Sequence, residues 1–331
     1  MTQNLSRRRF ICISAGTLAA GATPGAASFA NSPVVRWQGT AMGARAELIL
    51  NHPDRMKSRQ VLEQIQDEIH RLEKVFSLFD PESAISNLNK AGTLNLPPLD
   101  FIRCLSDATK ISLITNGAFD ATIQPLWDLY ATHFSNAPND SKGPPVQQII
   151  SARELVDYKA VRFNSESVSF SKPGMKVSLN GIAQGYITDR VAELLKAHGF
   201  TDVLIDLGET RGLGFRRDGS DWQVGIRAPD GSGKLIRKMA LHNKAIATSG
   251  GYGTRFTEDG TYHHLFDPKT GQSTNIWQSV SVIANTATRA DALSTAFSSM
   301  AESTIRKVAN EQGVSVVAND GSTTVLIGST S

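Results

Sequence analysis

The sequence has very little cysteine and, outside its first 30 residues, no excess of either charge. It contains two cysteines in 331 residues, and Cys12 lies in a segment that we expect to be removed. The remaining thiol, Cys104, therefore has no partner for an internal disulfide. Its apolar neighbours Phe101, Ile102 and Leu105 predict a buried, inert thiol in a helix rather than a nucleophile.

The balance of charge excludes one class of partner. Residues 1–30 contain three arginines and no acidic residue, so the formal charge of +3 falls to zero when they are set aside. The pI near 8.8 then gives no argument for nucleic acid. The chain also lacks a basic strip interleaved with aromatic residues. We therefore expect no nucleic-acid partner.

The N-terminus has the pattern of an export signal. Ser6-Arg7-Arg8-Arg9-Phe10 is followed by a weakly apolar run over 11–22 and by the small-residue site Ser28-Phe29-Ala30. The alternative is a basic tail before a short core helix. We predict a twin-arginine signal peptide over residues 1–30, a periplasmic location, and a single domain over residues 31–331. The apolar run is too short for a transmembrane helix.

Apolar spacing predicts a mixture of helices and strands. Helical periodicity marks 56–76, 101–115 and 185–199, and alternation marks a pair of strands over 34–50. Further strands are expected at 161–163, 168–170, 177–180, 203–207, 222–226, 238–241, 246–249, 280–284 and 324–327. We read 118–125 as a loop or short strand ended by Pro125, and 131–145 as a polar loop.

The most informative stretch is 288–297, where a strand leads into an Ala-rich helix. Asp291 is expected in the first turn, with Thr295 one turn later on the same face. This carboxylate and hydroxyl, with a backbone oxygen such as that of Ser294, are hard ligands that suit Mg²⁺. The alternative is structural, because an acidic residue in a first turn complements the helix dipole.

Other motifs have a functional and a structural interpretation. Gly39 and Gly43 around Met42 allow either a hairpin turn or close approach to a ligand. Asp80 and Asp120 fit helix caps or buried polar groups that need partners.

The spacing Gly181-x-x-x-Gly185 fits an anion-binding helix start or close helix packing. His263 and His264 stand near Asp267, but neighbouring strand residues point to opposite faces, which argues against zinc.

Taken in order, these motifs resemble the ApbE family of FAD:protein FMN transferases. The resemblance extends from Gly39 to about Gly313, and order and spacing make it specific. The motifs are 39–43, 80–89, 117–122 with Pro125, 181–186 with Asp189, 247–250, 264–271 and 290–295.

This resemblance implies an α+β fold with FAD in a cleft between two subdomains. It implies Mg²⁺-dependent cleavage of FAD at the pyrophosphate, transfer of FMN to a Thr or Ser hydroxyl of an acceptor flavoprotein, and release of AMP. The implied metal ligands are Asp291, Thr295 and backbone oxygens near Gly181 and Ser294. The implied FAD-contacting residues are Met42, Leu78, Phe79, Asp80, Phe119, Asp120, Ala121, Ser178, Gln184 and Phe266.

Three residues are candidates for the group that activates the acceptor hydroxyl: Asp291, His264 and Asp267. The sequence does not rank them. The chain also departs from many family members, which have Asp, Gly and Lys where it has Ser178, Asn180 and Gln184. Together with the twin-arginine pattern, these three residues make the chain look like the NosX subgroup, which is accessory to nitrous-oxide respiration. This resemblance implies a membrane-bound acceptor on the periplasmic side.

Two other functions remain open at this stage. Water could replace the acceptor hydroxyl, which would make the protein an FAD pyrophosphatase that releases FMN and AMP. Alternatively, the chain could bind FAD without catalysis, although Asp291 and Thr295 argue against this.

Overall fold

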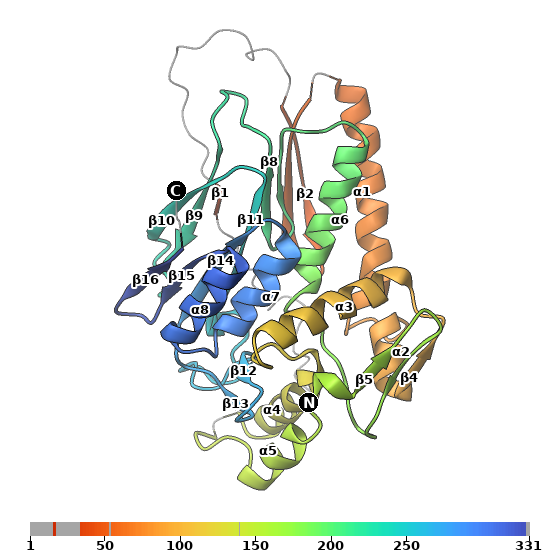
Figure 1. The fold of residues 1–331 in the computed structure, drawn as a ribbon, viewed down its shortest axis with the longest axis vertical. Coiled ribbons are helices and arrows are strands. Elements are labelled where there is room, and N and C mark those ends of the chain that lie inside the picture. The colour runs from red at the N-terminus through yellow and green to blue at the C-terminus, as the bar shows by residue number, and fades with distance from the viewer. Residues whose placement is uncertain (1–15, 18–33, 53, 139, 329–331) are drawn as a thin grey trace.

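The structure is a computed structural model that describes residues 16–17, 34–52, 54–138 and 140–328 (Figure 1). It combines helices and sheets and confirms the α+β prediction. Most of the predicted signal segment lies outside the described residues. Within that segment only β1 (Gly16–Thr17) is described, and it pairs with β9.

An eight-stranded sheet with antiparallel neighbours forms the centre of the molecule. Its order is β16-β15-β14-β11-β8-β7-β3-β2. In chain order the strands are β2 (Val34–Ala41), β3 (Ala44–Asn51), β7 (Val203–Asp206), β8 (Thr210–Leu213), β11 (Lys244–Ser249), β14 (Ser279–Ala284), β15 (Ser315–Asn319) and β16 (Thr324–Ile327).

Helices cover one face of this sheet, as Figure 1 shows. They are α1 (Arg55–Phe76), α3 (Leu99–Ile114), α6 (Ala183–Ala197), α7 (Ala287–Phe297) and α8 (Glu302–Gln312). Their apolar residues and the inward residues of the strands form the main core. Cys104 of α3 is fully buried in it, as predicted. No helix of the described residues is long and apolar enough to cross a membrane.

The opposite face of the sheet packs against a hairpin of β9 (Trp222–Arg227) and β10 (Leu235–Leu241).

The remaining elements form a smaller region beyond one end of the sheet. In Figure 1 this is the end at which α4, α5, β12 and β13 lie. They are α2 (Ala84–Ala91), β4 (Thr93–Asn95), η2 (Ala121–Ile123), α4 (Gln124–Asn136), α5 (Val146–Arg153), η3 (Tyr158–Ala160), β5 (Val161–Phe163), β6 (Ser167–Phe170), η4 (Gly251–Gly253), β12 (Phe266–Asp267) and β13 (Gln272–Ser273).

The β2–β3 hairpin is confirmed, and its turn is unusual. Met42 has a φ of 49° and Gly43 a φ of 78°. The Met42 amide donates a hydrogen bond of 2.8 Å to Glu73 Oε1 of α1. A left-handed non-glycine residue costs conformational energy, and this hydrogen bond offsets it. The turn is therefore fixed against α1, beside the hollow described below.

The prediction for 118–125 was wrong. Asp120 caps η2, and Pro125 lies in the first turn of α4 instead of ending a strand. Proline is tolerated there because the first amides of a helix have no acceptor within it. The loop expected at 131–145 is likewise shorter, because α4 continues to Asn136.

The strand predicted at 177–180 does not form. The Val177 backbone is instead paired with a side chain: its amide donates to Asn89 Oδ1 at 2.7 Å, and its carbonyl accepts Asn89 Nδ2 at 2.8 Å. The Ser178 amide donates to the Ala121 carbonyl at 2.7 Å. These contacts satisfy the backbone of an extended segment without a sheet partner.

Helices α6 and α7 pack very closely where they begin. A Cβ atom on Gly185 would lie 2.3 Å from the Ala287 carbonyl oxygen. Asp189 accepts hydrogen bonds of 2.9 Å from the amides of Ala287 and Thr288, which open α7, and it forms an ion pair with Arg211. The start of α7 is thus fixed by α6.

We predict that Gly185→Ala lowers the free energy of unfolding by about 1–3 kcal/mol or more, because the added methyl group forces the two helices apart. Lys196→Ala, at an exposed position of α6, should change it by no more than about 0.5 kcal/mol. Urea unfolding of both variants measures the difference. Equal stability of the two variants would contradict the close packing described here.

Candidate functional site

Helix α7 places the predicted metal ligands at one end of a large cavity. It begins at Ala287, so Asp291 is its fifth residue and lies just beyond the first turn, in which it was expected to lie; Thr295 follows one turn later, as expected. Asp291 is buried, and its Oδ2 accepts the Gly185 amide at 3.0 Å. Burial raises the pKa of Asp291 from 3.8 to about 7.

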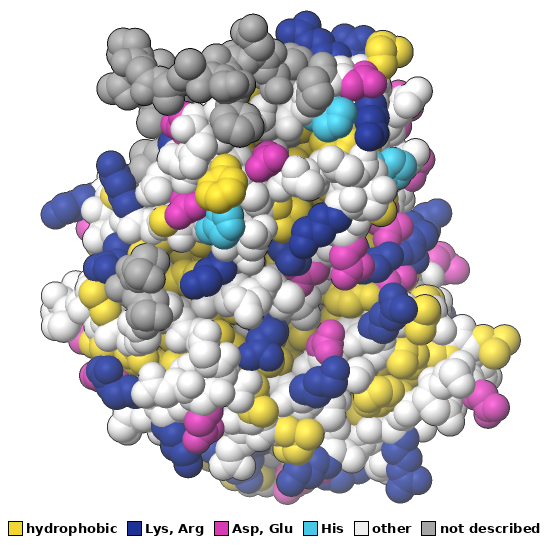
Figure 2. Space-filling view, turned by 45° about the horizontal axis from the view of Figure 1, so that its top comes forward, with side chains coloured by type: hydrophobic (Ala, Val, Ile, Leu, Met, Phe, Trp, Pro, Cys, Tyr) yellow, Lys and Arg dark blue, Asp and Glu magenta, His cyan; other side chains and the backbone are white. Residues whose placement is uncertain are grey.

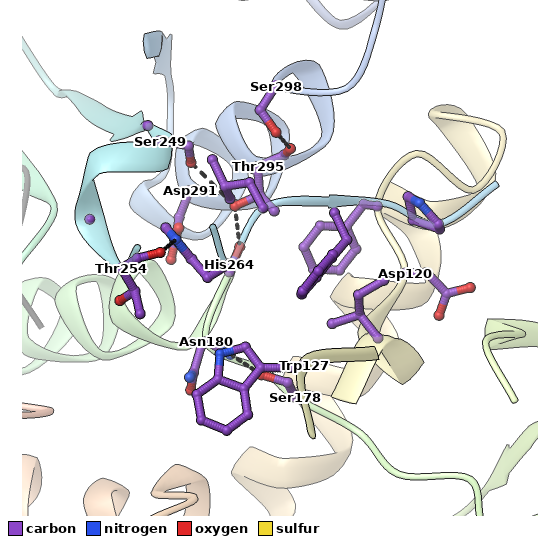
Figure 3. A pocket seen from close by; sticks show the side chains of 18 of the residues that line it. Asp120, Trp127, Ser178, Asn180, Ser249, Thr254, His264, Asp291, Thr295 and Ser298 are labelled. Atoms are coloured by element: carbon purple, nitrogen blue, oxygen red, sulfur yellow. Dashed lines mark hydrogen bonds between the residues drawn. The ribbon is translucent and has the colours of Figure 1, made fainter. Parts of the chain in front are cut away.

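Hydroxyl and carbonyl oxygens surround this carboxylate. Thr295 Oγ1 lies 3.5 Å from the Gly181 carbonyl oxygen and 3.3 Å from Ser249 Oγ, which lies 2.7 Å from Ser294 Oγ. Figure 3 shows Ser249, Asp291 and Thr295 gathered on one side of the cavity. Gly181 is needed here, because a Cβ atom on it would lie 2.9 Å from Thr295 Oγ1.

These oxygens suit a hard cation. Carboxylate, hydroxyl and carbonyl groups are the ligands of Mg²⁺, which also keeps several waters. The Ser294 carbonyl accepts the Ser298 amide at 3.2 Å within the helix. Of the four predicted metal ligands, Gly181, Asp291 and Thr295 line the cavity, whereas Ser294 does not line it and contacts Ser249 Oγ through its hydroxyl.

His264 lies close to this cluster and is neutral. Burial lowers its pKa to about 4. Its Nδ1 lies 3.1 Å from the Thr254 carbonyl oxygen, which can only accept, so Nδ1 has the proton. The Nε2 atom is then left as an acceptor. His264 lines the cavity with Asp291, whereas Asp267 does not line it and accepts the Lys269 amide at 2.9 Å.

The rest of the cavity wall is mainly apolar, aromatic and neutral polar, with acidic but no basic side chains among its described residues. Phe119, Trp127 and Phe266 line it together with Ser178 and Gln184. None of the described residues that line it is a lysine or an arginine. The acidic residues among the described lining are Asp120, Glu209 and Asp291.

A second hollow continues the cavity and shares Asn180 and Gln184 with it. Met42, Leu78, Phe79 and Asp80 line this hollow. The two spaces comprise about 1180 and 1640 Å³ free of protein atoms, including their open mouths. Together they are large enough for a dinucleotide.

Two of the predicted FAD-contacting residues, Asp120 and Ala121, make structural contacts within the protein. The Asp120 carboxylate accepts hydrogen bonds from Thr122 N, Thr122 Oγ1 and Tyr158 N, so it is both cap and buried polar group. Burial nevertheless raises its pKa. In Figure 3 it lies across the cavity from Asp291. Ala121 does not line either hollow, and its carbonyl supports the Ser178 amide.

Sequence reasoning gave no role to several residues of the cavity wall. They are Trp127, Glu209, Ser249 and Thr254. Ser249 and Glu209 each end a predicted strand, which was the available signal. Their approach to α7 depends on the strand order β14-β11-β8-β7, and this order cannot be inferred from separate motifs.

Comparison with solved structures defines the fold class. The structure is similar to the ApbE protein from Thermotoga maritima, with a TM-score of 0.79 and 28% identity over 89% of this chain and 97% of that one. It is similar to the flavin transferase ApbE from Vibrio cholerae, with a TM-score of 0.78 and 24% identity over 90% and 98%. The fold is therefore that of the ApbE flavin transferases.

The sequence places the chain in the same family. The ApbE family pattern matches residues 42–318. A Treponema pallidum relative named FAD:protein FMN transferase is 30% identical over 71% of this chain and 70% of its own length. A Haemophilus influenzae relative with the same name is 29% identical over 78% of each chain. This chain belongs to the ApbE family.

We predict that Asp291→Asn stabilises the protein, measured in EDTA, by an amount that grows between about pH 4 and pH 7. The folded wild type keeps a proton on Asp291 in this window that the unfolded chain has lost, so its stability falls as the pH rises. The variant has no such group. Melting temperatures at several pH values measure the difference, and a difference independent of pH would contradict the raised pKa.

Proposed function

We propose that this chain is a Mg²⁺-dependent FAD:protein FMN transferase. A Thr or Ser hydroxyl of an acceptor flavoprotein attacks the FMN phosphorus of FAD. A phosphoester forms to the acceptor, the bond from that phosphorus to the bridging oxygen breaks, and AMP leaves with that oxygen. Membership of the ApbE family and the names of the relatives support this activity.

The observation that carries the proposal is the oxygen cluster at the end of a dinucleotide-sized cavity. Asp291, Thr295 and the Gly181 carbonyl would hold the cation, with the Ser294 carbonyl beside them. When bound, Mg²⁺ neutralises charge that develops on phosphate oxygens. Phosphoryl transfer depends mainly on such neutralisation and on positioning.

His264 is the residue best suited to take the proton of the acceptor hydroxyl. Its Nδ1 is engaged by Thr254, which fixes the ring and leaves Nε2 as an acceptor, and His264 lines the cavity. A pKa of about 4 keeps the ring unprotonated at physiological pH, although it also makes the ring a weaker base than an exposed imidazole. Asp291 would be occupied by the metal, and Asp267 lies outside the cavity lining.

The aromatic and apolar wall provides the binding surface for FAD. Phe119, Trp127 and Phe266 in the first hollow, and Met42 and Leu78 in the second, offer faces suited to flat rings.

The residues Ser178, Asn180 and Gln184 support an assignment to the NosX subgroup. All three line the first cavity, which has no lysine or arginine among its described lining residues. With less positive charge near the phosphates, the metal becomes the main source of charge compensation. We accordingly propose a membrane-bound acceptor on the periplasmic side that serves nitrous-oxide respiration.

A transfer assay tests the proposed function. Purified protein is incubated with FAD, Mg²⁺ and a periplasmic flavoprotein fragment that has an acceptor Thr, and products are followed by intact mass and AMP release. We expect the fragment to gain one FMN only with Mg²⁺. Asp291→Ala should reduce the rate at least 100-fold, because it removes the charged ligand.

Thr286→Ser is the control, since it changes the cap of α7 without touching the cavity and keeps its hydroxyl. AMP and free FMN without labelling would favour the pyrophosphatase. Absence of FAD turnover would leave a binding protein, and normal turnover by Asp291→Ala would refute the metal assignment.

Export by the twin-arginine route is a separate prediction. In cells, Arg7→Lys/Arg8→Lys should retain the protein in the cytoplasm, because the pathway recognises the guanidinium pair. Arg9→Lys, next to the pair, should be exported normally. Cell fractionation and the mass of the periplasmic form, shorter by about 30 residues, measure the outcome. Export of the double variant would refute this route.

A further inference from the structure

Glu209 is a buried acidic residue of the cavity wall that has no role in the mechanism above. It follows Gly208, whose φ of 103° makes a turn after β7 that a side chain would strain. Only 7% of Glu209 is exposed, compared with 4% of Asp291. Both residues line the same cavity, although 82 positions separate them in the sequence.

This second carboxylate has little compensation from the protein. A hydrogen bond from the Thr248 backbone favours its charged form, whereas burial and the nearby Asp291 raise its pKa well above 4.5. Among the described residues, no ion pair involves either Glu209 or Asp291. No lysine or arginine is among the described residues that line their cavity. Buried charges are stable only when they are paired or bind a cation.

Asp206 lies three residues before Glu209 and is also buried. Comparing the two residues shows whether burial alone brings an acidic residue to the site. Asp206 is 8% exposed, burial raises its pKa to about 6, and its Oδ1 has no hydrogen-bond partner among the described residues. It does not line the cavity. Glu209 and Asp206 are therefore alike in being buried acidic residues of the same turn. They differ because Glu209 faces the site of Asp291.

Strand order explains why Glu209 reaches this place. Strand β11 lies between β8 and β14 and ends at Ser249, next to Thr248. The Glu209 side chain contacts the Thr248 amide, and Ser249 Oγ contacts the hydroxyls of Ser294 and Thr295 on α7. The end of β11 thus connects Glu209 to the proposed metal ligands.

We propose that Glu209 is a positioning residue of the metal site, whose carboxylate accepts a hydrogen bond from a water on the cation held by Asp291 and Thr295. This inference rests on the proposed function. Mg²⁺ binds through one or two carboxylates and keeps several waters, so a second carboxylate beyond the direct ligands is appropriate. Such an outer group orients bound water and adds attraction for the cation.

Binding of Mg²⁺ alone tests this role without relying on catalysis. The full chain is treated with EDTA, dialysed and titrated with Mg²⁺ by calorimetry, and its melting temperature is measured with and without Mg²⁺. For Glu209→Gln we expect the dissociation constant to rise about 10- to 100-fold. The Mg²⁺-dependent gain in melting temperature should shrink accordingly. Asp206→Asn, the matched control, should bind Mg²⁺ within about threefold of the wild type.

The variants also show whether folding is responsible. Without metal, Glu209→Gln should melt no lower than the wild type, because glutamine has the same shape and removes a desolvated charge. If it does not fold, Glu209→Asp, which keeps the charge but shortens the side chain, must still bind Mg²⁺ more weakly than the wild type.

Three results would overturn the inference. Binding by Glu209→Gln within threefold of the wild type would refute it and leave the proposed function intact. Equal weakening by Asp206→Asn would show a general effect of buried acids. Failure of the wild type to bind Mg²⁺ would refute both this inference and the metal requirement of the proposed function.

Discussion

The contact between α6 and α7 determines the geometry of the whole site. Gly185 allows the Ala287 backbone to approach to a distance that any side chain would prevent. Its amide binds Asp291, and one turn later Asp189 binds the first amides of α7. Helix α6 therefore fixes the position of α7, the residue at which α7 begins and the Asp291 carboxylate. Close packing of this kind is rigid because interiors have few voids to absorb movement.

The charge distribution shows the cost of this arrangement. Asp291 and Glu209 are buried near each other, and the described lining of their cavity supplies no lysine or arginine. On the outer face in Figure 2, positive and negative side chains are instead interspersed. A cavity that concentrates negative charge is less stable when empty and more attractive to a cation. The proposed cation would therefore offset an unfavourable feature of the empty cavity, which is a common compromise at functional sites.

Periodic parts of the fold were predictable from the sequence, and irregular parts were not. The helix at 55–76 and the hairpin at 34–51 follow directly from apolar spacing, because one face of each is buried. The segment at 177–180 has the same alternation but pairs with the side chain of Asn89, 88 residues away. Pattern alone cannot distinguish a strand from an extended segment whose backbone is satisfied in this way.

The site itself was predictable only where its residues share one element. Asp291 and Thr295 lie one helical turn apart, so their common direction follows from helix geometry. Glu209 and Ser249 join them through the order of the strands, which local patterns do not specify.

The proposed base illustrates the same limit, because the sequence could not rank His264 against Asp267. The two residues lie three positions apart. Thr254 binds one nitrogen of His264 and burial keeps the ring neutral, whereas Asp267 caps a turn through the Lys269 amide. Residue types suggest which groups can move a proton. Their partners in the fold decide which one has a lone pair facing the cavity.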